Sequence, residues 1–248
     1  MRCLALALLL ALAGSLAGLT AAVAAEACPP APDQLLGMPA TRAALTHGRK
    51  VTIVAFGSSS TEGSGASGQD RTYPAVLEAE LRNTLPLARL RVLNRGRGGQ
   101  EVHEMMERLE TDVIAAQPTL VIWQAGANAV LRGMEPEAFI AAMADGIDRL
   151  QARGIDVVLM DSQRAPRILN APHFERFDAA LQTISAQMQV PLFSRAALMR
   201  AWEATGTPNA NMLKADGLHH NDHGYACLAQ ALAKAVVHAA GPRIIAGR

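Results

Sequence analysis

After residue 48 the chain alternates between two kinds of segment, and this alternation constrains the fold more than any other feature. Short runs rich in β-branched residues are separated by longer Ala-, Leu-, Glu- and Arg-rich stretches with a helical period. The pattern predicts a parallel sheet covered by helices, because parallel strands need long, usually helical crossover connections. The expected strands lie at 50–56, 90–94, 120–124, 156–160 and 191–193. The expected helices lie at 73–84, 101–116, 136–153, 173–188, 195–204 and 222–239.

The same region shows no internal repeat, charge run or low-complexity linker that would divide it. We therefore expect one α/β domain at 48–248, preceded by a short N-terminal arm at 26–47. With 23 Lys+Arg against 22 Asp+Glu, the chain has no basic excess to neutralise a phosphate backbone, so no nucleic-acid partner is expected. Its 3 Cys among 248 residues are too few for a disulfide scaffold or a four-ligand zinc site.

The first residues have the pattern of an export signal. Arg2 precedes a Leu-rich run at 4–12, and small residues end the segment at Ala22-x-Ala24. Residues 1–25 are therefore predicted to be a secretory signal peptide, which places the mature protein in the periplasm or outside the cell. No stable membrane insertion is expected after cleavage. The alternative is an uncleaved membrane anchor, because residues 4–25 carry no charge.

Two cysteines remain after the predicted cleavage, Cys28 in the arm and Cys227 in the last predicted helix. In an oxidising compartment they could form one disulfide, and otherwise they are two unpaired thiols.

Chemistry in an open parallel sheet sits outside the carboxyl ends of the strands. Small or polar blocks follow three of the predicted strands, and a fourth block precedes the last predicted helix. They are Gly-Ser-Ser-Ser-Thr at 57–61, Asn-Arg-Gly-Arg-Gly-Gly at 94–99, Gly-Ala-Asn at 126–128 and Asp-Gly-Leu-His-His-Asn at 216–221.

In this order the four blocks resemble the SGNH, or GDSL-type, serine hydrolase superfamily over about residues 51–232. The resemblance implies a three-layer α/β/α domain with a flavodoxin-like, doubly wound parallel sheet of about five strands. It also implies that Ser59 is the nucleophile and that His219, oriented by Asp216, is its base. The oxyanion hole would consist of the Ser59 N–H together with Gly99 and Asn128. No cofactor and no metal are implied.

These residue types suit acyl transfer. A neutral hydroxyl is a weak nucleophile, and it needs a base whose tautomer is fixed by an acceptor. The tetrahedral intermediate carries a negative oxygen, which preorganised N–H donors stabilise. Two positions depart from the family's usual pattern: Ser58 stands where an acidic residue normally precedes the nucleophile, and Ala129 stands where one normally follows the Asn.

Competing motifs fit less well. Residues 63–68 match the Gly-x-Gly-x-x-Gly dinucleotide fingerprint, but residues 57–62 separate them from the predicted strand. His219 and His223 have the spacing of metal ligands on a helix, yet no distant Cys/His pair completes a site, and His220 and His223 are expected at the surface or as caps. An α/β-hydrolase would need Gly where Thr61 stands.

Further polar residues follow the predicted strands: Arg95, Arg97, Gln124, Gln163 and Arg164. They could line the mouth of the site and bind substrate, or they could be solvated loop ends.

The sequence thus predicts an exported serine esterase that removes short acyl groups through an acyl-serine intermediate. The expected substrates are small-molecule or saccharide esters, including O-acetyl groups on saccharides or envelope glycans. The alternatives are a thioesterase or lysophospholipase of the same superfamily, an acyltransferase that uses a sugar in place of water, and a non-catalytic binding protein that retains the fold.

Overall fold

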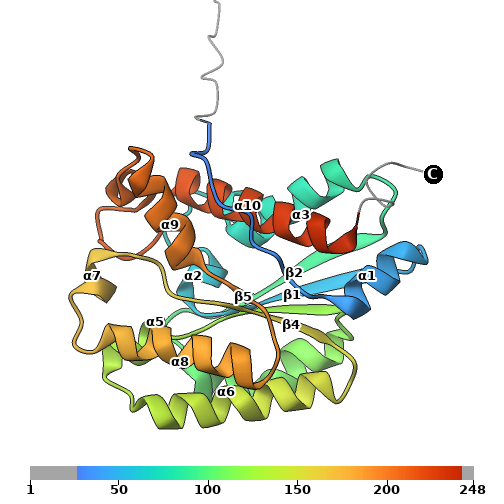
Figure 1. Cartoon of the computed structure of the whole chain (residues 1–248), viewed down its shortest axis with the longest axis horizontal. Helices are drawn as coiled ribbons and strands as arrows, with labels where there is room; N and C mark the ends of the chain where they lie inside the picture. Colours follow the sequence, from blue (N-terminus) through green and yellow to red (C-terminus); the bar gives the residue numbers. More distant parts are fainter. Residues whose placement is uncertain (1–26, 242–248) are drawn as a thin grey trace, which may run out of the picture.

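The computed structural model describes residues 27–241, in which a central sheet lies between two layers of helices (Figure 1). The strands are β1 (Val51–Gly57), β2 (Leu90–Gly96), β3 (Leu120–Gln124), β4 (Asp156–Met160) and β5 (Leu192–Phe193). Within the described residues these five strands are all parallel and lie in the order β2-β1-β3-β4-β5. The expected α/β fold class with a doubly wound parallel sheet is confirmed.

The central strands are mostly apolar because helices cover both faces of the sheet. Every residue of β1, β3 and β4 is buried, whereas β2, at one edge, is mostly half-buried. Helices α3 and α10 lie together on one side of the sheet, and α6 and α8 lie on the other (Figure 1). The longer helices are α1 (Pro39–Thr46), α3 (Tyr73–Thr84), α6 (Pro136–Gln151), α8 (Phe174–Gln187), α9 (Arg195–Ala204) and α10 (Asp222–Ala240).

Shorter turns of helix follow the strand ends or join longer elements. They are α2 (Ser59–Glu62), α4 (Val102–Glu107), α5 (Ala127–Arg132), α7 (Pro166–Leu169), the 3-10 turns η1 (Gln69–Arg71), η3 (Ile114–Ala116) and η4 (Asn209–Met212), and the π-helical turn η2 (Leu109–Val113). Sequence periodicity predicts none of α2, α5 or α7, because one or two turns are too short to show a repeat.

One helix that the sequence predicts as continuous is broken in the structure. The sequence predicts a single helix over 101–116, but α4 ends at Glu107 and the chain continues through η2 and η3. Arg108, at the junction, is buried and donates to backbone carbonyls of the sheet and to the side chain of Gln100. The helical period persists across the break, so the pattern alone does not reveal it.

The N-terminal arm is fastened to the sheet. Sequence periodicity does not predict α1 in this arm, yet the helix forms and is capped from a distance by Asp156, the first residue of β4. The Asp156 carboxylate accepts hydrogen bonds from the backbone N–H groups of Ala40 (3.2 Å) and Thr41 (2.7 Å). It thereby satisfies donors that have no partner inside the helix.

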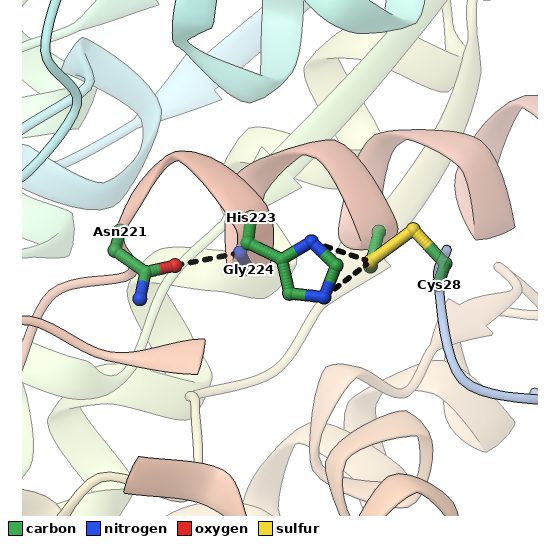
Figure 2. Close-up of a disulfide and its surroundings, with 5 residues drawn as sticks. Cys28, Asn221, His223 and Gly224 are labelled. Atoms are coloured by element: carbon green, nitrogen blue, oxygen red, sulfur yellow. Dashed lines mark hydrogen bonds between the residues drawn. A yellow bond between two sulfur atoms is a disulfide. The ribbon is translucent and has the colours of Figure 1, made fainter. Parts of the chain in front are cut away.

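A disulfide joins the arm to the last helix. Cys28 and Cys227 are bonded across a sequence separation of 199 residues, so the pairing left open by the sequence is formed here. Figure 2 shows the bond beside the first turn of α10, where the Asn221 side chain accepts from the Gly224 N–H at 2.9 Å. The ring nitrogens of His223 lie 3.8 and 3.9 Å from the sulfur of Cys227.

The predicted signal peptide at 1–25 lies outside the described residues. Among residues 27–241, no helix combines the length and the apolar character needed to cross a bilayer.

His220 is not at the surface, contrary to expectation. Its side chain is fully buried, and Nδ1 lies 2.9 Å from the carbonyl oxygen of Met212. Because a carbonyl only accepts, Nδ1 carries the proton. Burial, reinforced by the charge of Arg195, lowers the pKa of His220 to about 3. The residue follows His219 directly, so the turn that presents His219 to the site turns the next side chain inward.

Removing the disulfide should weaken the fold. In a Cys28→Ser/Cys227→Ser double variant we expect the free energy of unfolding to fall by about 2–5 kcal/mol, because the unfolded chain loses a long-range cross-link. Urea denaturation of the variant and of the oxidised wild type measures the difference. Wild type treated with reductant is the matched control and should approach the variant. Equal midpoints in all three samples would show that the bond contributes nothing.

His220 should make the fold sensitive to acid. Its folded-state pKa lies below the unfolded value of about 6.5, so below that pH the unfolded chain takes up a proton that the folded chain refuses. The free energy of unfolding should therefore fall from about pH 6.5 toward pH 3, by on the order of 1 kcal/mol per pH unit.

A His220→Asn variant, which keeps a donor for Met212 but does not titrate, should lose less stability than wild type between pH 7 and pH 5. The same substitution at the exposed His47 is the control and should leave the wild-type pH dependence unchanged. Parallel pH profiles for His220→Asn and wild type would contradict the assignment.

Candidate active site

Three polar side chains meet at the carboxyl edge of the sheet. Ser59 is the first residue of α2 and follows β1 almost directly, while Asp216 and His219 lie in the turn before α10. The Nε2 atom of His219 is 2.9 Å from the Ser59 hydroxyl oxygen, and its Nδ1 is 2.6 Å from Asp216 Oδ2. An ionised carboxylate only accepts, so Nδ1–H donates to Asp216 and Nε2 faces Ser59 as an acceptor.

The turn around Asp216 holds the carboxylate in place. Its Oδ1 accepts from the backbone N–H groups of Leu218 (2.9 Å) and His219 (3.0 Å), while Oδ2 faces the imidazole. Burial raises the pKa of Asp216, but the hydrogen bonds from His219 and Leu218 together outweigh it and hold the pKa below its usual value. Asp216 is therefore ionised at neutral pH, and one turn supplies both the acid and the imidazole.

The two predicted oxyanion donors lie after β2 and after β3, on segments that a hydrogen bond joins. Gly99 adopts φ 76°, a left-handed conformation that favours glycine, in the loop after β2. Asn128 lies in the first turn of α5, after β3, and its Nδ2 donates to the carbonyl of Gln100 at 2.9 Å. A side-chain amide has two N–H groups, so this bond orients the Asn128 amide and leaves one N–H for a ligand.

Both departures from the superfamily pattern have a structural counterpart. Ser58 is buried, and its N–H and hydroxyl both donate to Oε1 of Gln124, at 3.0 and 3.1 Å. A neutral bond to the end of β3 thus anchors the residue before Ser59. Ala129 is buried in the core, where an acidic side chain would be costly.

The polar residues that follow the strands bond to other parts of the protein. Gln124 and Gln163 are buried, and Gln163 Nε2 donates to the carbonyl of Leu218 at 2.9 Å, which supports the turn that carries His219. Both predicted roles, substrate contact and solvated loop end, are wrong for these two residues.

The arginines of the same set also bond within the protein. Arg95 donates to the backbone carbonyl of Asp112, and Arg97 donates to the carboxylate of Asp112 at 2.8 Å. Arg164 is half-buried, and its backbone N–H lies 3.2 Å from the sulfur of Met199.

The helix α2 packs directly on β2, and only glycine allows the contact. A Cβ atom on Gly96 would run into the backbone nitrogen of Glu62 and the carbonyl carbon of Thr61. Because Ser59 opens this same helix, the approach of α2 to β2 fixes where its hydroxyl lies relative to the loop after β2.

The glycine-rich segment at 63–68 is part of the wall of this site. It is followed by η1 rather than directly by a long helix, and Ser67 donates to the carboxylate of Asp222 through its N–H (2.8 Å) and its hydroxyl (2.5 Å). A Cβ on Gly65 would lie 3.0 Å from the Cβ of His219. The segment therefore packs against the turn that carries the imidazole, which is not the strand-to-helix geometry of a dinucleotide site.

Among the described residues, no group of three or more His, Cys, Asp or Glu side chains is arranged to hold a metal ion.

The sequence did not point to the residues that support the loop of Gly99 and Gln100. Arg132, at the end of α5, donates to the carbonyl of Gly99 at 2.6 Å and forms ion pairs with Glu101 and Glu104. Gln100 accepts from Arg108 through its side chain. Arg108 lies within a predicted helix and Arg132 in none, and no motif distinguishes either from a solvated arginine.

Solved structures share this fold. A two-domain esterase active on acetylated mannans superposes with a TM-score of 0.68 at 21% identity, over 83% of this chain and 52% of that one. This chain thus spans about half the length of that esterase. An acetylxylan esterase from Geobacillus stearothermophilus superposes with a TM-score of 0.63 at 19% identity, over 75% of this chain and 94% of that one. A lipase/acylhydrolase from Enterococcus faecalis superposes with a TM-score of 0.61 at 21% identity, over 74% of this chain and 94% of that one.

A search of curated proteins finds no match to this chain. A family model does match the whole of the described region. The model of the non-GDSL lipase-like family covers residues 25–242. In this chain Ser58 occupies the place of the acidic residue that gives the GDSL pattern its second letter, in agreement with the name of the family. With the fold and this match together, the chain belongs to the non-GDSL lipase-like family of the SGNH/GDSL-like hydrolase superfamily.

Proposed function

We propose that this protein is a serine ester hydrolase in which Ser59 is the nucleophile, His219 the general base and Asp216 the residue that orients it. The observation that carries the proposal is the continuous chain of contacts from Ser59 Oγ to His219 Nε2 (2.9 Å) and from His219 Nδ1 to Asp216 (2.6 Å). Ser59 and His219 are 160 residues apart in the sequence, so the fold, not local structure, brings them together.

In the proposed mechanism, His219 Nε2 accepts the proton of Ser59 as the oxygen attacks the acyl carbon, and Asp216 stabilises the resulting imidazolium. The negative oxygen of the tetrahedral intermediate faces the N–H groups of Ser59 and Gly99 and the free amide N–H of Asn128. When the intermediate collapses, His219 returns the proton to the departing alcohol and the acyl group stays on Ser59. Water, activated by the same imidazole, then releases the acid.

We propose short-chain esters of saccharides or envelope glycans, acetyl esters foremost, as substrates. Solved structures with the same fold include esterases described as active on acetylated mannans and on acetylxylan, which supports this class over long acyl chains. Export to the periplasm or the medium through residues 1–25 is part of the proposal. The Cys28–Cys227 disulfide supports it, because disulfides persist mainly in oxidising compartments. Residues 48–248 would form the hydrolase domain.

Replacing Ser59 with Ala should abolish ester hydrolysis. We expect hydrolysis of p-nitrophenyl acetate to fall by about 10³-fold or more, and covalent labelling by a fluorophosphonate to disappear, because the nucleophile is gone. The matched control is Ser60→Ala, the neighbouring hydroxyl, which should keep the label. A p-nitrophenyl series from acetate upward gives the acyl preference.

Three outcomes would contradict the assignment in different ways. Labelling that survives in Ser59→Ala would place the nucleophile elsewhere. A preference for long acyl chains would favour the lysophospholipase-like alternative. A wild type with neither turnover nor label would favour a binding protein.

Replacing Asn128 with Ala should lower kcat by about 10²–10³-fold, because one preorganised donor to the oxyanion is lost. KM should change only a few-fold, since the donor acts on the transition state more than on the ground state. An Asn128→Asp variant keeps the size of the side chain but directs a negative charge at the oxyanion, so its kcat should be at least as low. Steady-state kinetics on p-nitrophenyl acetate measures both, and an Asn128→Ala variant with wild-type kcat would exclude Asn128 from the oxyanion hole.

A further inference from the structure

Arg108 is a buried guanidinium at the break between α4 and η2. Its side chain is 6% exposed, and it donates to acceptors on three separate segments. Nε donates to Gln100 Oε1 at 2.6 Å. The two terminal nitrogens donate to the carbonyls of Arg95 (2.8 Å) and Gly57 (3.0 Å). The side chain therefore connects the carboxyl ends of β1 and β2 with the loop that follows β2.

The charge of this guanidinium is paired with a carboxylate, and its plane lies over an aromatic ring. The carboxylate of Asp112, one helical turn further on, pairs with Arg108 at 3.1 Å. The central carbon of the guanidinium lies 4.5 Å from the centre of the Phe56 ring, within the range of a cation–π contact. The planar fork is what reaches Gln100, Arg95 and Gly57 at once, and a lysine ammonium on its flexible stem could not reproduce that geometry.

Each end of this connection lies next to a proposed catalytic group. Gly57 is two residues before Ser59, and its carbonyl also accepts from the Arg97 N–H at 3.0 Å. Gln100 contacts Arg108 with its side chain and accepts from the Asn128 amide with its backbone carbonyl. A path of hydrogen bonds thus runs from the Asn128 side chain through Gln100 and Arg108 to the strand end that carries Ser59.

The break in the helix belongs to this arrangement. A continuous helix over 101–116 would keep regular i to i+4 bonding past Arg108, whereas the observed chain widens into a π-helical turn just after it. Such turns are often found at functional sites. On the other side of the same loop, Arg132 donates to the carbonyl of Gly99 at 2.6 Å. The carbonyl of Gly99 and the side chain of Gln100 thus each accept a hydrogen bond from an arginine.

We propose that Arg108 is a positioning residue for the oxyanion hole, which sets the place of Asn128 relative to Ser59 through Gln100 and Gly57. The inference rests on the proposed function and assigns Gln100 the role of relay. Arg108 touches no substrate; it acts by holding the donor loop in register with the nucleophile. Misplacing a catalytic group by about 1 Å can cost on the order of 10²-fold in rate.

The test is a double-mutant cycle between Gln100 and Asn128. Gln100→Ala removes the acceptor for Arg108 but leaves the backbone carbonyl, and should lower kcat on p-nitrophenyl acetate by about 10- to 10²-fold with KM nearly unchanged. Gln100→Glu keeps an acceptor oxygen and should retain most of the activity. In an Asn128→Ala background, Gln100→Ala should have almost no further effect, because the donor it positions is gone.

Arg108→Lys is the second arm and should resemble Gln100→Ala in kcat. Should Arg108→Lys fail to fold, the Gln100 cycle decides the question alone, since that side chain is only half-buried. The matched structural control is Asp156→Ala, which uncaps α1 away from the site; it should lower stability and leave kcat unchanged.

Two results would overturn the inference. In an active wild type, equal losses from Gln100→Ala in the Asn128 and Asn128→Ala backgrounds would show that Gln100 does not act through Asn128. A wild type that neither turns over an ester nor takes a fluorophosphonate label would remove the proposed function, and this inference with it. The two failures are distinguishable, because the first requires wild-type turnover.

Discussion

The arrangement of the site depends on the register in which β1 pairs with β2. That register places Gly57 opposite Gly96, so two strands end in glycine side by side. With no side chain on Gly96, α2 folds back over the strand ends and brings Ser59 close to the loop that carries Gly99. A shift of one residue in this pairing would put a side chain in that space and separate the hydroxyl from the proposed oxyanion donors. The site is thus determined first by backbone packing and only then by its polar groups.

Around this contact, charge is used sparingly. Asp216 is held as an anion by three hydrogen bonds within its own turn and is oriented toward a single imidazole. The residue before the nucleophile is neutral, because Ser58, bonded to Gln124, stands in place of an acidic residue. The buried positive charge of Arg108 is paired with Asp112, outside the path of the reacting atoms. The residue before the nucleophile therefore brings no carboxylate of its own toward the developing oxyanion.

The sequence predicted the sheet and the approximate ends of most elements, because buried strands and amphipathic helices leave periodic patterns. It also identified Ser59, Asp216 and His219, which the fold brings into contact, since chemistry at strand ends follows from topology. It could not predict the supporting contacts. In the sequence, Gln124 and Gln163 look like solvated residues at strand ends. In the fold both are buried against segments distant in the sequence, which contain Ser58 and Leu218 respectively. Arg108 and Gln100 depend on a break in a helix whose hydrophobic period continues unbroken through it.

The disulfide between the arm and α10 also constrains the chain when it is unfolded. Cys28 and Cys227 enclose every residue of the sheet and of the proposed site, so an open chain would have to close a loop of about 200 residues before gaining any contact in return. In the folded domain the Cα atoms of the two cysteines are 5.3 Å apart, so the fold itself meets most of the cost of closing that loop. The bond thus limits how far the unfolded chain can expand over almost the whole length of the domain.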